Sequence, residues 1–192
     1  ILNQSELGSL TQGDTQSAEA YDLVKEGAEL LEKGSREANQ NANRLFLKAI
    51  DLDPSYVDAY SGLARCAVMS PALSLNHPNH AYAMANKYSN EALRLNPSHI
   101  DSQTTKVSLT LQIDRDTTKA MELAQGLLMN HPDNLRVLQQ IGTILSFSGK
   151  TGLAVSTLKR GLELDPKNAN LHQHLAFVYL KSGEEKLAET HN

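Results

Sequence analysis

The 192-residue sequence contains no tryptophan and only one cysteine, and aromatic residues make up just 5% of it. One cysteine cannot form an intrachain disulfide, and a lone thiol does not distinguish a reducing from an oxidising compartment. Scarce aromatic residues, together with recurring Ala, Leu and Asn, favour close helix packing over strand pairing. The composition therefore predicts an all-α protein.

The sequence also lacks a basic excess and a long apolar run. Its formal net charge is -4, whereas a nucleic-acid-binding surface needs clustered cations to neutralise phosphates. Its apolar stretches are broken by Ser, Thr, Gly or Lys well short of the roughly 20 residues that span a bilayer. We therefore expect no nucleic-acid partner and no membrane insertion by this segment, and a soluble protein of the cytoplasm or the periplasm.

The first 16 residues have neither the basic region nor the apolar core of a signal peptide, and the chain begins with Ile rather than Met. This pattern indicates a cut or processed chain whose targeting signal, if any, lies outside it. We expect residues 1–16 to form a flexible N-terminal segment.

What the sequence does contain is a short phrase that recurs four times. Its prolines are 43, 35 and 34 residues apart, so the period settles near 34 residues, and such a period indicates a repeat of paired helices. The four copies are Leu52-Asp53-Pro54, Leu95-Asn96-Pro97, Asn130-His131-Pro132 and Leu164-Asp165-Pro166.

The last full copy shows the pattern of the repeat most completely. Its residues are Leu138, Ile141, Gly142 and Leu145 in a first helix, then Gly149, then Ala154, Leu158 and Gly161 in a second helix before Pro166. This pattern resembles the tetratricopeptide repeat, which has large residues at positions 4, 7, 11 and 24, small ones at 8, 20 and 27, and Pro at 32. The copy departs from the family only in having Gly161 where the family has Ala.

Each element of this pattern has a physical reason. Positions 8, 20 and 27 are where paired helices cross, and only Gly, Ala or Ser lets the backbones approach there. Proline cannot continue a helix, and we expect each Asp-Pro pair to supply the N-cap and first-turn residue of the next helix. Gly149 is expected to end the first helix of its hairpin.

The other copies fit with insertions. Three extra residues fall within 35–41, and nine fall within 70–79, where Pro71 and Pro78 predict a loop. The third copy is the weakest match, and the fifth stops early. The repeats are expected at about 20–54, 57–97, 100–132 and 135–166, with a partial fifth at 169–192.

Helices are therefore expected at about 17–33, 35–53, 55–69, 79–95, 98–113, 116–130, 133–148, 151–164, 167–182 and 184–191. A helix hairpin of this size cannot bury its apolar stripe alone, so successive hairpins must stack on one another. We expect a single domain over residues 17–192, a right-handed α-solenoid of about four full tetratricopeptide hairpins plus a partial fifth.

No set of residues in the sequence indicates catalysis. His172 and His174 lie two residues apart on an expected helix, which turns them about 200° away from each other and argues against a shared metal. His77 and His80 lie in or beside the long loop of the second repeat, with His99 as a possible neighbour, and could form a fortuitous transition-metal site there, but an ordinary loop explains them without a metal. Cys66 falls where the repeat needs a small apolar residue. We expect no enzyme activity, no cofactor and no metal.

The resemblance places function on the first helix of each repeat. In similar proteins these helices line a concave groove, and positions 2, 5 and 9 point into it. Such a polar row suits hydrogen bonding to an extended peptide, so the resemblance implies a non-catalytic scaffold that binds a protein or peptide partner. The implied partner-binding residues are Asp58, Ser61, Arg65, Asp101, Thr104, Ser108, Arg136, Gln139, Thr143, Asn170 and Gln173.

Two alternatives stay open. The incomplete fifth repeat is expected to leave Leu175, Val178 and Tyr179 partly uncovered, so the chain could form a homodimer through them. Residues 43–66 also resemble the first repeat of tetratricopeptide domains in bacterial winged-helix regulators and adenylate cyclases, which implies a regulatory arm of a larger protein.

A chaperone-tail receptor is disfavoured. Chaperone-binding members of the family hold a C-terminal carboxylate with a clamp of Lys and Asn residues, and Ser61, Arg65, Thr104 and Ser108 do not supply that clamp.

Overall fold

The computed structural model describes residues 15–114 and 116–190. These residues are mostly helical and include no β-strand, so the all-α prediction is confirmed. The expected flexible segment at residues 1–16 falls outside the described residues except for its last two positions.

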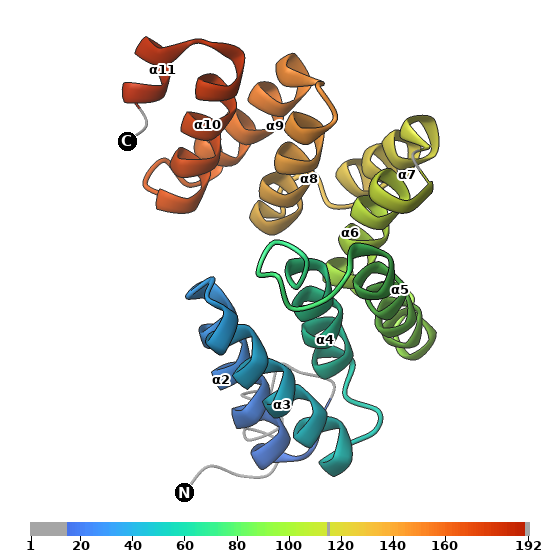
Figure 1. Cartoon of the computed structure of the whole chain (residues 1–192). Helices are drawn as coiled ribbons and strands as arrows, with labels where there is room; N and C mark the ends of the chain where they lie inside the picture. Colours follow the sequence, from blue (N-terminus) through green and yellow to red (C-terminus); the bar gives the residue numbers. More distant parts are fainter. Residues whose placement is uncertain (1–14, 115, 191–192) are drawn as a thin grey trace, which may run out of the picture. The chain divides into compact units, whose positions relative to one another are not determined.

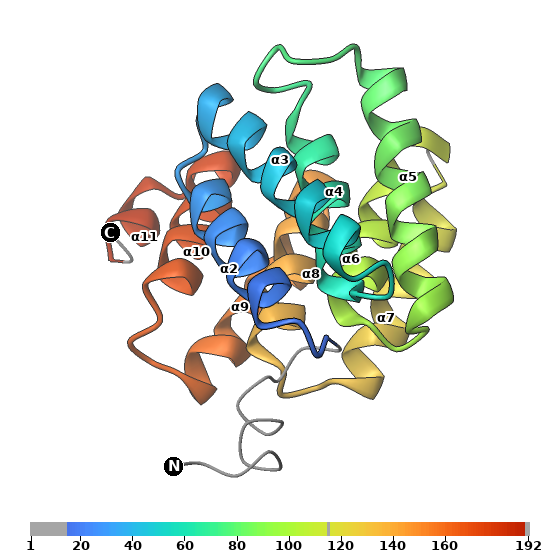
Figure 2. The ribbon, with the colours of Figure 1, turned by 90° about the horizontal axis from the view of Figure 1, so that it is seen from below.

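The chain divides into two compact units (Figures 1 and 2). Unit 1 covers residues 1–109 and unit 2 covers residues 110–192. Unit 1 contains α2 (Ala18–Glu32), α3 (Arg36–Leu52), α4 (Val57–Met69), α5 (Pro78–Leu95) and α6 (Ile100–Leu109). Unit 2 contains η1 (Thr110–Asp114), α7 (Thr117–Asn130), α8 (Leu135–Phe147), α9 (Thr151–Leu164), α10 (Ala169–Ser182) and α11 (Glu185–Glu189).

The boundary between the units falls inside one expected helix. The sequence predicts a helix at 98–113, but the α-helix ends at Leu109 and continues as a π-helical turn to Asp114. A π-helical turn inserts an extra residue into the helical ladder. A single domain over residues 17–192 stays a prediction.

In unit 1, one phenylalanine joins two hairpins. α2 packs on α3 and α4 packs on α5, with α3 against α4 (Figure 2). Phe46 of α3 is 1% exposed, and a Cβ atom added at Gly27 or Gly62 would lie only 2.8 or 2.5 Å from its ring. The ring therefore fills the space that these glycines leave on α2 and α4, and an alanine at either position would overpack the core.

In unit 2, the helix crossings occur where the repeat pattern predicts them. A Cβ atom at Gly142 of α8 would lie 2.6 Å from the Cγ atom of Leu158 in α9. A Cβ atom at Gly161 would lie 2.7 Å from Leu171 of α10. The requirement for small residues at these crossings is confirmed. Gly149 ends α8 with a φ of +73°, a left-handed conformation that favours glycine.

The expected N-caps are wrong. Helix α10 follows Asp165-Pro166 but begins at Ala169, three residues after the proline, and Asn168 caps it by accepting the amide N–H of Leu171. Asn134 caps α8 in the same way by accepting the amide N–H of Val137. The residue before the proline has another role. Asp53 accepts the amide N–H of Ser55 at 2.9 Å, so it closes a short turn around the proline rather than capping the next helix.

The expectation that the fifth repeat leaves apolar side chains uncovered is also wrong. Leu175, Val178 and Tyr179 are 0%, 1% and 3% exposed. The short helix α11 and helix α9 both pack against α10 and supply the missing cover. The apolar side chains that do reach solvent near this end are Phe177, Leu180 and Leu187.

Candidate protein-binding surfaces

The predicted partner-binding residues lie on the first helices of the hairpins. In unit 1 they belong to α4 and α6, which contact each other, and in unit 2 to α8 and α10, which also contact each other. We refer to these two regions as the α4–α6 surface and the α8–α10 surface.

Two of the predicted residues on the α4–α6 surface do not reach solvent. Ser61 is 3% exposed and Thr104 is 2% exposed. The Thr104 hydroxyl donates to backbone carbonyls of its own helix, at 2.9 Å from Asp101 O and 3.1 Å from Ile100 O. The Ser61 hydroxyl has no hydrogen-bond partner among the described residues. Both side chains fill space between helices and cannot contact a partner in this arrangement.

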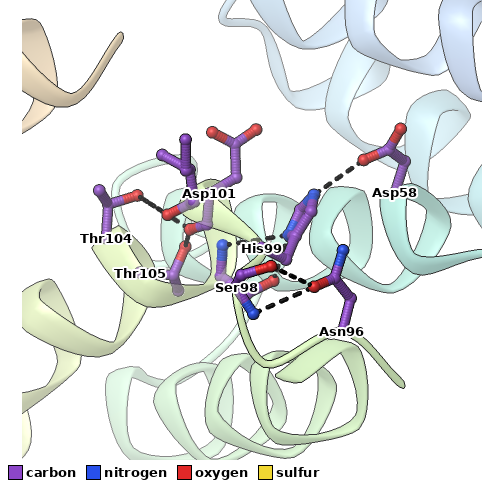
Figure 3. A network of polar contacts seen from close by, with 9 residues as sticks. Asp58, Asn96, Ser98, His99, Asp101, Thr104 and Thr105 are labelled. Atoms are coloured by element: carbon purple, nitrogen blue, oxygen red, sulfur yellow. Dashed lines mark hydrogen bonds and ion pairs between the residues drawn. The ribbon is translucent and has the colours of Figure 1, made fainter. Parts of the chain in front are cut away.

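A histidine links α4 to the start of α6 (Figure 3). The Nε2 atom of His99 lies 2.9 Å from Oδ1 of Asp58, and its Nδ1 atom lies 2.9 Å from Oγ of Ser102. The amide N–H of Ser102 also points at Nδ1, so Nδ1 accepts and Nε2 donates to the carboxylate. Asp58 is thereby already engaged within the protein.

Arg65 is engaged in the same way. Its guanidinium lies 3.0 Å from a carboxylate oxygen of Glu32 at the end of α2. Helix α2 carries five acidic residues and one lysine, so this part of unit 1 is strongly acidic. The predicted residues Asp101 and Ser108 of unit 1 are partly exposed, as are Asp58 and Arg65.

On the α8–α10 surface, another histidine joins two predicted residues. His174 of α10 lies 3.0 Å from the amide nitrogen of Gln139 and 3.0 Å from the hydroxyl of Thr143. Because that hydroxyl donates to the carbonyl of Gln139 at 2.8 Å, it accepts from Nδ1–H of His174, and Nε2 accepts from the Gln139 amide. Burial lowers the pKa of His174, which favours this neutral form.

The rest of the α8–α10 surface is exposed and contains no acid. Arg136, Asn170 and Gln173 all reach solvent. Neither α8 nor α10 contains an Asp or Glu residue. Any acidic partner segment would therefore meet no like charge from these two helices.

The sequence prediction missed an aromatic pair on this surface. Phe147 and Phe177 are 66% and 42% exposed, and their ring centroids lie 5.6 Å apart. The ammonium of Lys181 lies 4.8 Å from the centroid of Phe147 and donates to the carbonyl of Ser146. Phe177 lies 34 residues after Thr143, so the repeat period alone was sufficient to place it at position 9 of the fifth repeat.

The residues considered for metal binding and catalysis are not grouped into a reactive site in the described part of the chain. No cluster of three or more His, Cys, Asp or Glu residues suited to a metal occurs in the described part of the chain. Cys66 is 1% exposed, and burial raises the pKa of its thiol to about 12, so it is a poor nucleophile at neutral pH. Among the described helices, none has the length and apolarity required to cross a bilayer.

Comparison with known proteins agrees with this architecture. Residues 135–168 match the tetratricopeptide repeat family. The structure of TTC0263, a thermophilic tetratricopeptide-repeat protein of Thermus thermophilus, covers 90% of this chain and 87% of its own, with a TM-score of 0.69 and 18% identity. That of PilW, a type IV pilus biogenesis factor, covers 91% of this chain and 75% of its own, with a TM-score of 0.61 and 17% identity.

A curated sequence relative matches part of the chain. Uncharacterized protein y4yS of Sinorhizobium fredii (strain NBRC 101917 / NGR234) is 26% identical over 96 residues, which are 49% of this chain and 52% of that protein. The chain thus spans about half the length of this relative. Residues 135–168 thus match the tetratricopeptide repeat, and the helix hairpins have the fold of tetratricopeptide-repeat structures.

Proposed function

We propose that this chain is a non-catalytic scaffold that holds a partner protein on its α8–α10 surface, and that the bound segment is extended and acidic with at least one apolar side chain. The observation that carries the proposal is the exposed pair Phe147 and Phe177 on two helices that contain no acidic residue. Tetratricopeptide repeats are typically non-catalytic, and because one fold can carry many functions, it is this surface that supports the binding role.

The aromatic pair supports an apolar anchor on the partner. Exposed aromatic side chains that gather at one place are uncommon on a surface that faces only water, and aromatic residues dominate the binding energy of interfaces. The ammonium of Lys181 over the ring of Phe147 places a cation beside this anchor point. An apolar side chain next to an acidic one would therefore meet complementary groups.

The polar residues of the surface support an extended backbone. Gln173 and Asn170 are exposed amides on α10, and an amide can donate to one peptide group and accept from another. Gln139, Thr143 and His174 hold one another through hydrogen bonds. This network already fixes the three side chains, so little of their conformational entropy would be lost when a partner binds.

The test is selection from a random peptide library on the immobilised protein. The proposal predicts enrichment of peptides in which Asp or Glu flanks an aromatic or aliphatic residue. The combined variant Arg136→Glu and Phe177→Ala should lose these peptides. The matched control is Lys119→Glu with Leu153→Ala, which makes similar charge and size changes at exposed positions of α7 and α9.

Two outcomes would contradict the proposal. One is enrichment of basic peptides, and the other is retention of acidic peptides by the Arg136→Glu and Phe177→Ala variant. Circular dichroism of each variant shows whether a lost interaction is due to a lost fold.

The alternative occupant of the α8–α10 surface is a second copy of the chain, since Phe147, Phe177 and Leu180 form an exposed apolar set. A monomer in sedimentation at high micromolar concentration excludes that alternative.

A further inference from the structure

Unit 1 contains a polar pocket away from the predicted partner-binding residues. It has a volume of about 530 Å³ and lies among α3, α4, α5 and the inserted loop at residues 70–77. Helix α3 contributes Asn39, Gln40, Asn43 and Arg44, while α5 contributes His80 and Tyr88. A volume of this size is within the range of small-molecule sites in proteins.

The insertion that interrupts the second repeat forms one wall of this pocket. Leu75 and Asn76 of the loop line it. The loop is tied down at two points: the guanidinium of Arg36 donates to the carbonyl of Ser74 at 3.1 Å, and the amide of Asn76 donates to the hydroxyl of Ser70 at 3.5 Å. The extra residues of this repeat therefore build a defined wall rather than a simple connection.

The pocket is unusual in its charge. The protein as a whole carries a formal net charge of -4, yet none of the described residues that line the pocket is Asp or Glu. Arg44 lines it, and in the described structure its guanidinium donates only to uncharged groups, the carbonyl of Gln40 and the side chain of Asn41. Its positive charge is therefore not neutralised by a carboxylate of the protein.

Several other polar side chains also line the pocket. The buried side chain of Asn39 donates to the carbonyl of Cys66 at 3.2 Å, which fixes its orientation. Within the described part of the chain, the side-chain amide of Asn43 and the ring of His80 have no hydrogen bond to protein. Amide and imidazole donors beside a guanidinium are the groups that bind carboxylates and phosphates in proteins.

We propose that this α3–α5 pocket binds a small hydrophilic molecule through an anionic group, a carboxylate or a phosphate, with Arg44 as the principal contact and the amide of Asn43 as the second. The polar lining argues against an apolar ligand, because the amides would lose their hydrogen bonds to water without replacement. The missing carboxylates argue against a hard cation such as Mg²⁺ or Ca²⁺. This site is independent of the proposed function on the α8–α10 surface.

The test is isothermal titration calorimetry of the full chain with three probes: succinate, inorganic phosphate and succinamide. Succinamide matches succinate in size but carries no charge. The proposal predicts heat of binding with succinate or phosphate and none with succinamide. Binding by succinate alone indicates carboxylate ligands and binding by phosphate alone indicates phosphorylated ones, so the two anions distinguish the source of the charge.

Two variants and one control identify the site. Arg44→Gln should weaken anion binding roughly ten-fold or more, since it removes the charged donor. Asn43→Asp, which keeps the shape of the side chain and adds a negative charge, should weaken it by a similar factor. Lys48→Gln is the control, because Lys48 lies one turn further along α3, is exposed, and does not line the pocket.

Three results would overturn the proposal: no heat with either anion at about 10 mM, equal binding of succinamide and succinate, or equal losses in Arg44→Gln and Lys48→Gln. The last result would mean that only net charge matters. Signals of the side-chain amides in ¹H–¹⁵N spectra provide a second readout. On anion binding, the Asn43 signals should shift in the wild type, and this shift should be absent in Arg44→Gln.

Discussion

The two units present very different surfaces on the same kind of helix hairpin. Among the described residues, unit 1 exposes two large apolar side chains, Leu47 and Leu52, whereas unit 2 exposes nine, including Phe147 and Phe177. Helix α2 of unit 1 carries five acidic residues, while α8 and α10 of unit 2 carry none. In unit 1, two cross-helix contacts already occupy Asp58 and Arg65.

This difference shows what the repeat fixes and what it leaves free. Small residues at helix crossings, such as Gly62 in unit 1 and Gly142 in unit 2, are demanded by distances of 2.5 and 2.6 Å to the facing side chain. Solvent-facing positions have no such demand, so charge and apolarity can differ between repeats without changing the fold. Differences in binding between the repeats are therefore expected at the solvent-facing positions where the two units differ.

The largest expected effect concerns whether the two units are stabilised separately. Phe46→Ala should lower the free energy of unfolding of unit 1 by about 3–5 kcal/mol, and Leu158→Ala should lower that of unit 2 by about 2–5 kcal/mol. Both side chains are fully buried. Hydrogen exchange measures this, because each variant should lose protection mainly in its own unit. Equal loss along the whole chain in both variants would show that the units unfold together.

The next largest expected effect concerns the absence of acidic residues from the α8–α10 surface. Asn170→Asp with Gln173→Glu keeps side-chain shape and adds two negative charges to α10. Binding of acidic peptides should fall roughly ten-fold, since like charges across an interface are unfavourable. Fluorescence anisotropy with a labelled acidic peptide measures the change. The opposite change of charge on α2, Glu26→Gln with Glu29→Gln, serves as the control and should leave this binding unchanged.

A smaller effect concerns the buried histidine of unit 2. Burial lowers the pKa of His174 below its ordinary value of 6.5, so the unfolded chain binds this proton more readily than the folded one. Stability from this residue is present at neutral pH and is lost as pH falls below about 6.5. The thermal midpoint should therefore decrease more steeply toward acid pH in the wild type than in His174→Gln.

A matched control distinguishes this residue from a general effect of acid. His172→Gln changes the same residue type two positions away on α10, and it should keep the steeper wild-type dependence. The groups that hydrogen-bond to the His174 ring are the uncharged side chains of Gln139 and Thr143, so no partner carboxylate offsets the burial. Identical pH profiles for the wild type and His174→Gln would contradict the assignment.

Much of the fold follows from the sequence. The spacing of Pro54, Pro97, Pro132 and Pro166 was sufficient to identify the repeat, and nine of the ten expected helices are present within about two residues of their predicted bounds. The main exception is 98–113, which changes to a π-helical turn at Thr110. Such a change depends on backbone packing and leaves no periodic signal in the sequence.

The candidate surfaces follow from the sequence only in part. Ser61 and Thr104 occupy predicted binding positions but are buried, because α4 has helices α2 and α6 on its two sides and these short side chains fill the space between neighbours. Serine and threonine occur both in buried helix contacts and on exposed binding surfaces, so the residue type alone does not predict whether such a position is buried. The pocket beside Arg44 depends on how the loop at residues 70–77 folds back, which has no repeat pattern to predict it.

The smallest expected effect concerns the ion pair that engages Arg65 in unit 1. The side chains of Arg65 and Glu32 are 31% and 73% exposed, and exposed pairs contribute only about 0–1 kcal/mol. In a double-mutant cycle with Arg65→Gln and Glu32→Gln, the coupling energy from urea unfolding should be at most about 0.5 kcal/mol. A value well above that would mean that this ion pair between α2 and α4 stabilises unit 1. A negligible value means that Arg65 can exchange Glu32 for an acidic partner at little cost, so unit 1 would keep a binding capacity that its ion pairs conceal.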